Sequence, residues 1–167
     1  MPRIKLTELP SYRFSTTCPV RVDDINYGGH MDNARFVSFL HEARVRFLKE
    51  LGATEADLGD GATGIVMGDL AVNYKREVFH GATLTVRCDI GEIEARGFRV
   101  FYRMENEGAV AAIAETGIIG FDYGKRTVAR LPAAFIERVR DYGEAGGVRR
   151  EAAGLSVCMP RHEDRGR

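Results

Sequence analysis

The chain has little cysteine. Its 167 residues include only Cys18, Cys88 and Cys158. These three lie far apart in the sequence, and none stands in the CxxC or Cys/His spacing that is typical of a metal site. We therefore expect three reduced thiols and no bound metal ion.

An excess of charge of one sign is missing as well. Lysine and arginine together number 24, and aspartate and glutamate also number 24, so the formal net charge is zero. The chain thus lacks an overall positive field that would attract a nucleic-acid backbone or an anionic membrane. We expect no nucleic-acid partner, although a local basic cluster could still bind a ligand that carries a few phosphates.

Long apolar runs are absent too. No window approaches the ~20 apolar residues that are needed to span a bilayer. The opening stretch MPRIKLTELPSYRF lacks the apolar segment of a signal peptide. We expect a cytoplasmic protein without a membrane partner.

The composition is that of an ordinary folded domain. Hydrophobic residues make up 44% of the chain and charged residues 29%, and one domain usually has about 100 to 150 residues. We assign residues 1–142 to a single domain. Residues 143–167 are rich in Gly, Arg and Glu without periodicity, and we expect them to form a flexible C-terminal tail.

One long amphipathic helix is predicted for residues 33–51. Its apolar residues recur at spacings of three and four, as they do on one face of a helix. They are Phe36, Leu40, Ala43, Phe47 and Leu51. Asp32 or Asn33 can cap the start of this helix, and Gly52 can close its end. A helix with so broad an apolar face needs a sheet to lie against.

Strand-like segments account for most of the remaining chain. The predicted strands cover residues 14–22, 64–74, 83–90, 97–104 and 110–121, and a short second helix covers residues 133–142. Pro19 removes a backbone donor, which favours an edge strand or a bulge at that point. Turn signals at His80-Gly81 and around residues 105–108 favour antiparallel hairpins and a meander. The predicted fold class is therefore α+β, with an antiparallel sheet wrapped around one long central helix.

The stretch VRVDDINYGGHMDNARFVSFLHEARVRFLKELG resembles the opening of the 4-hydroxybenzoyl-CoA thioesterase family and of its acyl-CoA and acyl-carrier-protein thioesterase relatives. In that family an acidic loop runs through a Gly and a His-Val-Asn-Asn-like run into a long helix, which often carries a Glu-Ala-Arg step. The counterparts here are Gly29, His30-Met31-Asp32-Asn33 and Glu42-Ala43-Arg44. Two later segments, Val72-Asn73-Tyr74-Lys75-Arg76-Glu77 and Arg130-Leu131-Pro132, also resemble family segments, so the likeness covers about residues 14–142.

This resemblance implies the hotdog fold and the hydrolysis of an acyl-CoA, or less readily an acyl-carrier-protein, thioester. It implies no separate cofactor, because coenzyme A is part of the substrate. It also implies a homodimer or homotetramer in which protomers share the active site. Strand edges that pairing would protect favour such an assembly independently.

One position departs from the family. Members commonly place an Asp, which serves as nucleophile or general base, where this chain has Asn26. An amide can neither act as a base nor form an acyl anhydride. Asp24 stands two residues earlier, and its side chain would point the same way as that of Asn26 if the backbone there is extended. We therefore predict Asp24 as the base.

The start of the long helix is the second part of the predicted site. Thioester hydrolysis puts negative charge on the carbonyl oxygen, and backbone N–H groups near Asp32 to Ala34, with Asn33 among them, could receive it. The same groups could instead serve only to cap the helix. His30 in the Gly-rich loop could orient water or the substrate carbonyl, or it could be an ordinary loop histidine.

Further candidates lie outside the loop. Glu42 is a second candidate base, because a helix carboxylate has that role in other hotdog subgroups, but its spacing to Arg46 equally permits an ordinary surface ion pair. Arg76, Arg96 and Arg126 are predicted to bind the phosphates of coenzyme A, since arginine makes bidentate contacts with phosphate.

Two other functions stay open. Asn26 in place of an acid would suit a non-catalytic hotdog protein that binds acyl-CoA. Hotdog enoyl-CoA hydratases and dehydratases share the fold and use an acid together with a His, although the motif at the helix start resembles the thioesterase group more closely.

Overall fold

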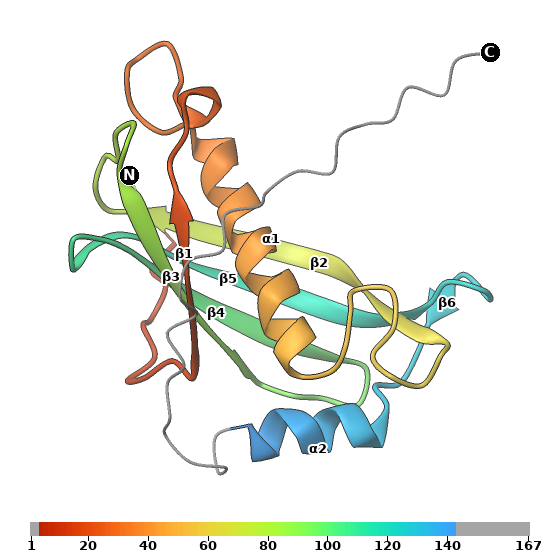
Figure 1. Cartoon of the computed structure of the whole chain (residues 1–167). Helices are drawn as coiled ribbons and strands as arrows, with labels where there is room; N and C mark the ends of the chain where they lie inside the picture. The colour runs from red at the N-terminus through yellow and green to blue at the C-terminus, as the bar shows by residue number, and fades with distance from the viewer. Residues whose placement is uncertain (1–3, 143–167) are drawn as a thin grey trace, which may run out of the picture.

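The computed structural model describes residues 4–142, which form an antiparallel sheet and two helices (Figure 1). In chain order the elements are β1 (Phe14–Pro19), a 3₁₀ turn (Val22–Asp24), α1 (Asn33–Glu50), β2 (Thr63–Tyr74), β3 (Thr83–Gly91), β4 (Gly97–Asn106), β5 (Ala109–Asp122), β6 (Thr127–Val128) and α2 (Ala133–Asp141). The predicted α+β class with an antiparallel sheet is confirmed. The predicted tail at residues 143–167, with Cys158, lies outside the described residues.

The strands of the sheet are ordered β1-β3-β4-β5-β2, and every pair of neighbours is antiparallel. The strands β3, β4 and β5 form the predicted meander. Pro19 lies on β1 at one edge of the sheet, where its missing donor interrupts no ladder. The turn at His80-Gly81 does not close a hairpin of β2 and β3, because β2 pairs with β5 at the opposite edge. Within residues 4–142, β2 is therefore left with one open edge.

The helix α1 forms where the periodicity predicts it. The Asp32 carboxylate accepts the Ala34 N–H at 2.8 Å and caps its start, and Gly52 follows its end with a φ of 66°. The side chains that it buries are Phe36, Phe39, Leu40, Ala43, Arg44, Phe47 and Leu48. Phe47 stacks on Phe14 of β1 with ring centroids 5.0 Å apart. α1 lies across the sheet (Figure 1), so the core forms between the helix and the inner face of the strands.

The second helix, α2, packs on a different part of the sheet (Figure 1). Phe135 contacts Phe98 of β4 with ring centroids 5.6 Å apart. Arg13 bridges β3 and α2, because its guanidinium donates to Asp89 at 2.6 Å and to the Val139 carbonyl at 2.7 Å. The sheet is thus accompanied by two helices. Neither helix of the described chain is both long and apolar enough to cross a membrane.

Hydrogen-bonded ion pairs fasten the loop after α1 to the middle of the helix. The Glu55 carboxylate accepts from Arg44 Nε at 2.7 Å and lies 2.8 Å from His41 Nε2. Partial burial would by itself raise the pKa of Glu55, but the hydrogen bonds from His41 and Arg44 outweigh it and lower the pKa below its usual value. The Glu55 carbonyl also accepts the Ile65 N–H at 2.8 Å, so this residue joins α1 to β2.

Candidate active site

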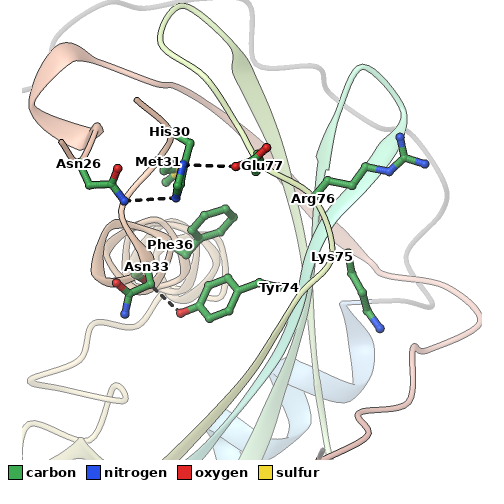
Figure 2. Close-up of a pocket in the computed structure, with 9 residues that line it drawn as sticks. All are labelled: Asn26, His30, Met31, Asn33, Phe36, Tyr74, Lys75, Arg76 and Glu77. Atoms are coloured by element: carbon green, nitrogen blue, oxygen red, sulfur yellow. Dashed lines mark hydrogen bonds and ion pairs between the residues drawn. The ribbon is translucent and has the colours of Figure 1, made fainter. Parts of the chain in front are cut away.

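A cavity of about 390 Å³ opens beside the first turn of α1 (Figure 2). Three segments meet there: the loop that precedes α1, the first turn of the helix, and the end of β2 with the residues that follow it. The lining residues are Asn26, His30, Met31, Asn33, Phe36, Tyr74, Lys75, Arg76 and Glu77. The loop and helix start that resemble the thioesterase motif therefore face one cavity.

The loop before α1 is closed by its own backbone. Ile25 and Met31 form an isolated antiparallel bridge, and the Asn26 N–H donates to the His30 carbonyl at 2.9 Å. Gly29 turns the chain with a φ of 86°, a conformation that L side chains rarely adopt. The Met31 N–H donates to the Val78 carbonyl at 2.8 Å. The loop is thus fixed both internally and to the segment after β2.

Three polar side chains form a row in this cavity (Figure 2). The His30 imidazole lies between Asn26 and Glu77: its Nε2 is 3.3 Å from Asn26 Nδ2, and its Nδ1 is 3.3 Å from Glu77 Oε1. The Asn26 Oδ1 accepts the Gly28 N–H at 2.9 Å. Sequence reasoning singled out Asn26 and His30 but missed Glu77. The segment that contains Glu77 was recognisable as family-like, but only the fold brings it beside His30.

Fewer N–H groups at the start of α1 are left for a ligand than the sequence suggests. The Asp32 carboxylate takes the Ala34 N–H, and the Asp32 N–H donates to the Asp24 carbonyl at 2.9 Å. The N–H groups of Arg35 and Phe36 point to the Asp32 carbonyl. Among residues 4–142 no group accepts the Asn33 N–H, so it is the one group of this turn that a ligand oxygen can use.

Apolar side chains form another wall of the cavity. Phe36 and Tyr74 meet edge to face with ring centroids 5.2 Å apart, and the Tyr74 hydroxyl donates to the Asn33 carbonyl at 3.1 Å. Partial burial, with a contribution from the negative charge of Asp32, raises the pKa of Tyr74. Tyr74 therefore remains a neutral donor at ordinary pH and ties the end of β2 to the start of α1. Met31, which is itself buried, completes this wall.

Of the three arginines predicted to bind coenzyme A, the structure brings one to the cavity. Arg76 lines it together with Lys75, and both side chains extend from the end of β2 away from α1 (Figure 2). Neither forms an ion pair with a carboxylate of the described chain. Arg96 and Arg126 are exposed elsewhere, and Arg126 lies over the Phe121 ring at 5.6 Å.

The expectation that Asp24 points the same way as Asn26 needs correction. It depended on an extended backbone, but β1 ends at Pro19 and Asp24 belongs to the 3₁₀ turn Val22–Asp24. The Asp24 carboxylate is buried, accepts the Arg21 N–H at 2.9 Å and lies 3.8 Å from Arg35 Nε. It does not line the cavity. Asp24 therefore stabilises the segment that leads into α1: its carboxylate accepts the Arg21 N–H of the 3₁₀ turn, and its carbonyl accepts the Asp32 N–H.

The structure does not bring Glu42 to the cavity either. Its carboxylate accepts from Arg46 Nε at 2.7 Å, which is the ordinary helical ion pair that the spacing permits. Arg46 in turn donates to Thr16 Oγ1 of β1 at 2.7 Å. Glu42 thus helps to hold α1 on the edge of the sheet.

Comparisons with known proteins agree with this picture of the fold. The sequence profile of the thioesterase-like superfamily matches residues 20–139. No curated protein shows significant similarity to the chain.

Solved structures resemble the chain in fold. A thioesterase from Thermus thermophilus, complexed with coenzyme A and Zn, is 22% identical with a TM-score of 0.71, over 83% of this chain and 99% of that one. A 1,4-dihydroxy-2-naphthoyl-CoA thioesterase from Synechocystis is 19% identical with a TM-score of 0.70, over 77% of this chain and 96% of that one. A gentisyl-coenzyme A thioesterase is 18% identical with a TM-score of 0.68, over 75% of this chain and 99% of that one. At these identities the likeness shows a shared fold.

Proposed function

Because the chain belongs to the thioesterase-like superfamily, we propose that it is an acyl-CoA thioesterase, which hydrolyses an acyl thioester to the free acid and coenzyme A. Structural relatives named as thioesterases of 1,4-dihydroxy-2-naphthoyl-CoA and gentisyl-coenzyme A, and one with coenzyme A bound, support a thioester of coenzyme A as the substrate. An acyl-carrier-protein thioester has the same reacting bond and is the second substrate class to test.

The observation that carries this proposal is the composition of the cavity beside α1. The Asn33 N–H, at the positive end of the helix, can receive the charge that develops on the thioester oxygen. Phe36 and Tyr74 provide an apolar wall for the acyl group. Lys75 and Arg76 stand at the end of β2, where phosphates of coenzyme A can meet them.

We infer that the protein works as a homo-oligomer that pairs along β2. Beyond Ile65, whose N–H is taken by the Glu55 carbonyl, the outer edge of this 12-residue strand pairs with no other strand of the described chain, and Met67, Leu70 and Tyr74 on it are exposed. An open edge of this length invites pairing with a second copy. Tyr74 ends β2 and lines the cavity, so a partner at this edge would stand close to the site.

Asn26 favours a second candidate, a non-catalytic protein that binds acyl-CoA. Its side chain occupies the position where the family commonly has an acid, and an amide cannot act as a base. Such a protein would bind acyl-CoA in the same cavity without turnover.

The test is release of free thiol from a panel of acyl-CoAs with straight, branched and aromatic acyl groups. The wild type is assayed beside Asn26→Asp and Asp24→Asn, and binding is measured in parallel by calorimetry. Release by the wild type supports the thioesterase. Binding without release, with release appearing in Asn26→Asp, would refute it in favour of the binding protein. Addition of water to an enoyl-CoA without thiol release would instead identify a hydratase.

A further inference from the structure

We propose that His30 is the general base of this site, acting through Nε2, and that Asn26 and Glu77 are positioning residues that keep the imidazole proton on Nδ1. This inference deepens the proposed thioesterase function and rests on it for the reaction. The arrangement of the three side chains can be tested separately. In this arrangement the Asn26 amide donates a hydrogen bond to His30 Nε2. The Asp that the family commonly has at this position could not do so when ionised, because a carboxylate only accepts.

The orientation of the Asn26 amide follows from the loop backbone. The Gly28 N–H needs an acceptor, and it donates to the Asn26 side chain at 2.9 Å, so the atom there is the oxygen Oδ1. The amide nitrogen then faces His30 Nε2 at 3.3 Å. An amide nitrogen only donates, so Nε2 must be the acceptor and carries no proton.

The other ring nitrogen leads to the same tautomer. His30 Nδ1 lies 3.3 Å from Glu77 Oε1, and an ionised carboxylate only accepts. This contact is an ion-pair distance and not a well-aligned hydrogen bond, so it favours a proton on Nδ1 by electrostatics: a proton on Nε2 would place the Nδ1 lone pair against the carboxylate. The hydrogen bond with Asn26 therefore specifies one form of the neutral ring, and the nearby Glu77 carboxylate favours the same form.

The backbone explains why two residues so far apart in the sequence meet. Met31 follows His30 and Val78 follows Glu77, and the Met31 N–H donates to the Val78 carbonyl at 2.8 Å. Met31 and Val78 are both buried. The hydrogen bond between these two neighbours places the His30 and Glu77 side chains on the same side of the cavity (Figure 2).

In the proposed reaction a water molecule takes the place of the Asn26 amide at His30 Nε2. The contact of 3.3 Å between Asn26 Nδ2 and His30 Nε2 is longer than a typical N–H···O hydrogen bond of about 3.0 Å. Replacing it by a hydrogen bond from water therefore loses little interaction energy. The water oxygen attacks the thioester carbonyl carbon while Nε2 takes a water proton, and the carbonyl electron pair moves onto oxygen near the Asn33 N–H. The intermediate then reforms the carbonyl and breaks the C–S bond, and Nε2 returns the proton to the leaving sulfur. The products are one carboxylic acid and one thiol.

Glu77 gains importance as the ring becomes charged. When Nε2 takes the proton, the imidazolium faces the Glu77 carboxylate through Nδ1–H, and opposite charges at this distance stabilise each other. The other charged residues that line the cavity, Lys75 and Arg76, extend away from α1 (Figure 2). Since Glu77 is 66% exposed, solvent screens the pair and limits the size of this effect.

The deciding experiment reads the tautomer directly. Protein labelled with ¹⁵N-histidine is examined by long-range ¹H–¹⁵N NMR at about pH 8.5, well above the ordinary histidine pKa of about 6.5. The His30 signals are assigned from their loss in His30→Gln. We expect Nδ1 to be protonated in the wild type. In Asn26→Asp both ring nitrogens would face carboxylates, which only accept, so we expect Nε2 to become protonated as well while Nδ1 keeps its proton. A proton on Nε2 in the wild type overturns the proposal whatever the activity.

Kinetics test the role of the pair in catalysis. We expect His30→Ala to lose about 100-fold or more in kcat, as removal of a general base usually does, and added imidazole to restore part of the loss. We expect Glu77→Gln to lower kcat about 10-fold with KM unchanged. The matched control is Glu92→Gln, since Glu92 is 68% exposed and lies near Arg99 instead.

The two proposals can fail separately. An unchanged kcat in Glu77→Gln, or an equal loss in Glu92→Gln, would overturn the positioning role of Glu77 while leaving a thioesterase. A wild type that releases no thiol from any acyl-CoA would refute the thioesterase and the base role together, and the NMR result would still decide the tautomer.

Discussion

The two cations at the end of β2 lead to the sharpest quantitative prediction. Lys75 and Arg76 line the cavity, are exposed, and pair with no carboxylate among residues 4–142. We expect replacement of both by Gln to raise KM for acyl-CoA without changing kcat, because the phosphates of coenzyme A take no part in the reacting bond.

The magnitude follows from their exposure. An exposed ion pair contributes about 0.5 to 1 kcal/mol, since solvent screens it, so two such contacts amount to about 1 to 2 kcal/mol. At about 1.4 kcal/mol per tenfold change, KM should rise about 5- to 30-fold. Added salt should reduce the difference between wild type and variant, because exposed charges are screened over about 8 Å at physiological ionic strength.

The assay compares two thioesters of one acyl group. Acyl-CoA carries the phosphates, whereas the acyl-N-acetylcysteamine thioester lacks the nucleotide. We expect the double variant to differ from the wild type only with acyl-CoA. Lys49→Gln, at the exposed far end of α1, is the control for loss of a positive charge. An equal rise in KM with the short thioester, or a larger effect of Arg96→Gln than of Arg76→Gln, would refute the reasoning.

Three further predictions concern stability. Asp32→Ala removes the cap of α1 and should lower the free energy of unfolding by about 1 kcal/mol, whereas Asp32→Ser should retain most of it; urea melts with equal slopes would measure this. Glu55 has a pKa lowered below its usual 4.5, so its stabilising effect should be complete above about pH 4.5 and should fade as pH falls through the lower value of the folded state. The difference in unfolding free energy between wild type and Glu55→Gln, measured by urea melts at several pH values, should therefore shrink in acid; a constant difference would contradict the coupling to His41 and Arg44. Phe47→Ala empties a fully buried site and should cost about 3 to 5 kcal/mol, measured as a fall in the urea midpoint; a loss below about 1 kcal/mol would mean that the core does not depend on this ring.

The sequence was a good guide to the elements and a weaker guide to how they pair. Periodicity located α1 and the strands of the meander, because apolar spacing reports directly which face of an element is buried. The turn at Gly81 was recognisable, but a turn shows where the chain reverses and not which strand becomes the neighbour. The pairing of β2 with β5 is a non-local choice that the local pattern does not encode.

The sequence predicted the part of the candidate site that lies within one local motif. Asn26 and His30 lie in a recognisable loop, and both line the cavity. Asp24 failed to join them because a short 3₁₀ turn replaced the extended backbone that would have aligned the two side chains. Glu77 was missed because its place beside His30 depends on the hydrogen bond between Met31 and Val78, which only the folded chain forms.

The open edge of β2 has a consequence for how activity should be measured. Since this strand ends at Tyr74, inside the cavity wall, a second chain at that edge would support the same wall that receives the acyl group. Dimerisation would then be part of enzyme assembly, and specific activity would depend on protein concentration. Progressive dilution into the assay should reveal a threshold below which turnover per chain falls, and the position of that threshold would report the dissociation constant of the assembly.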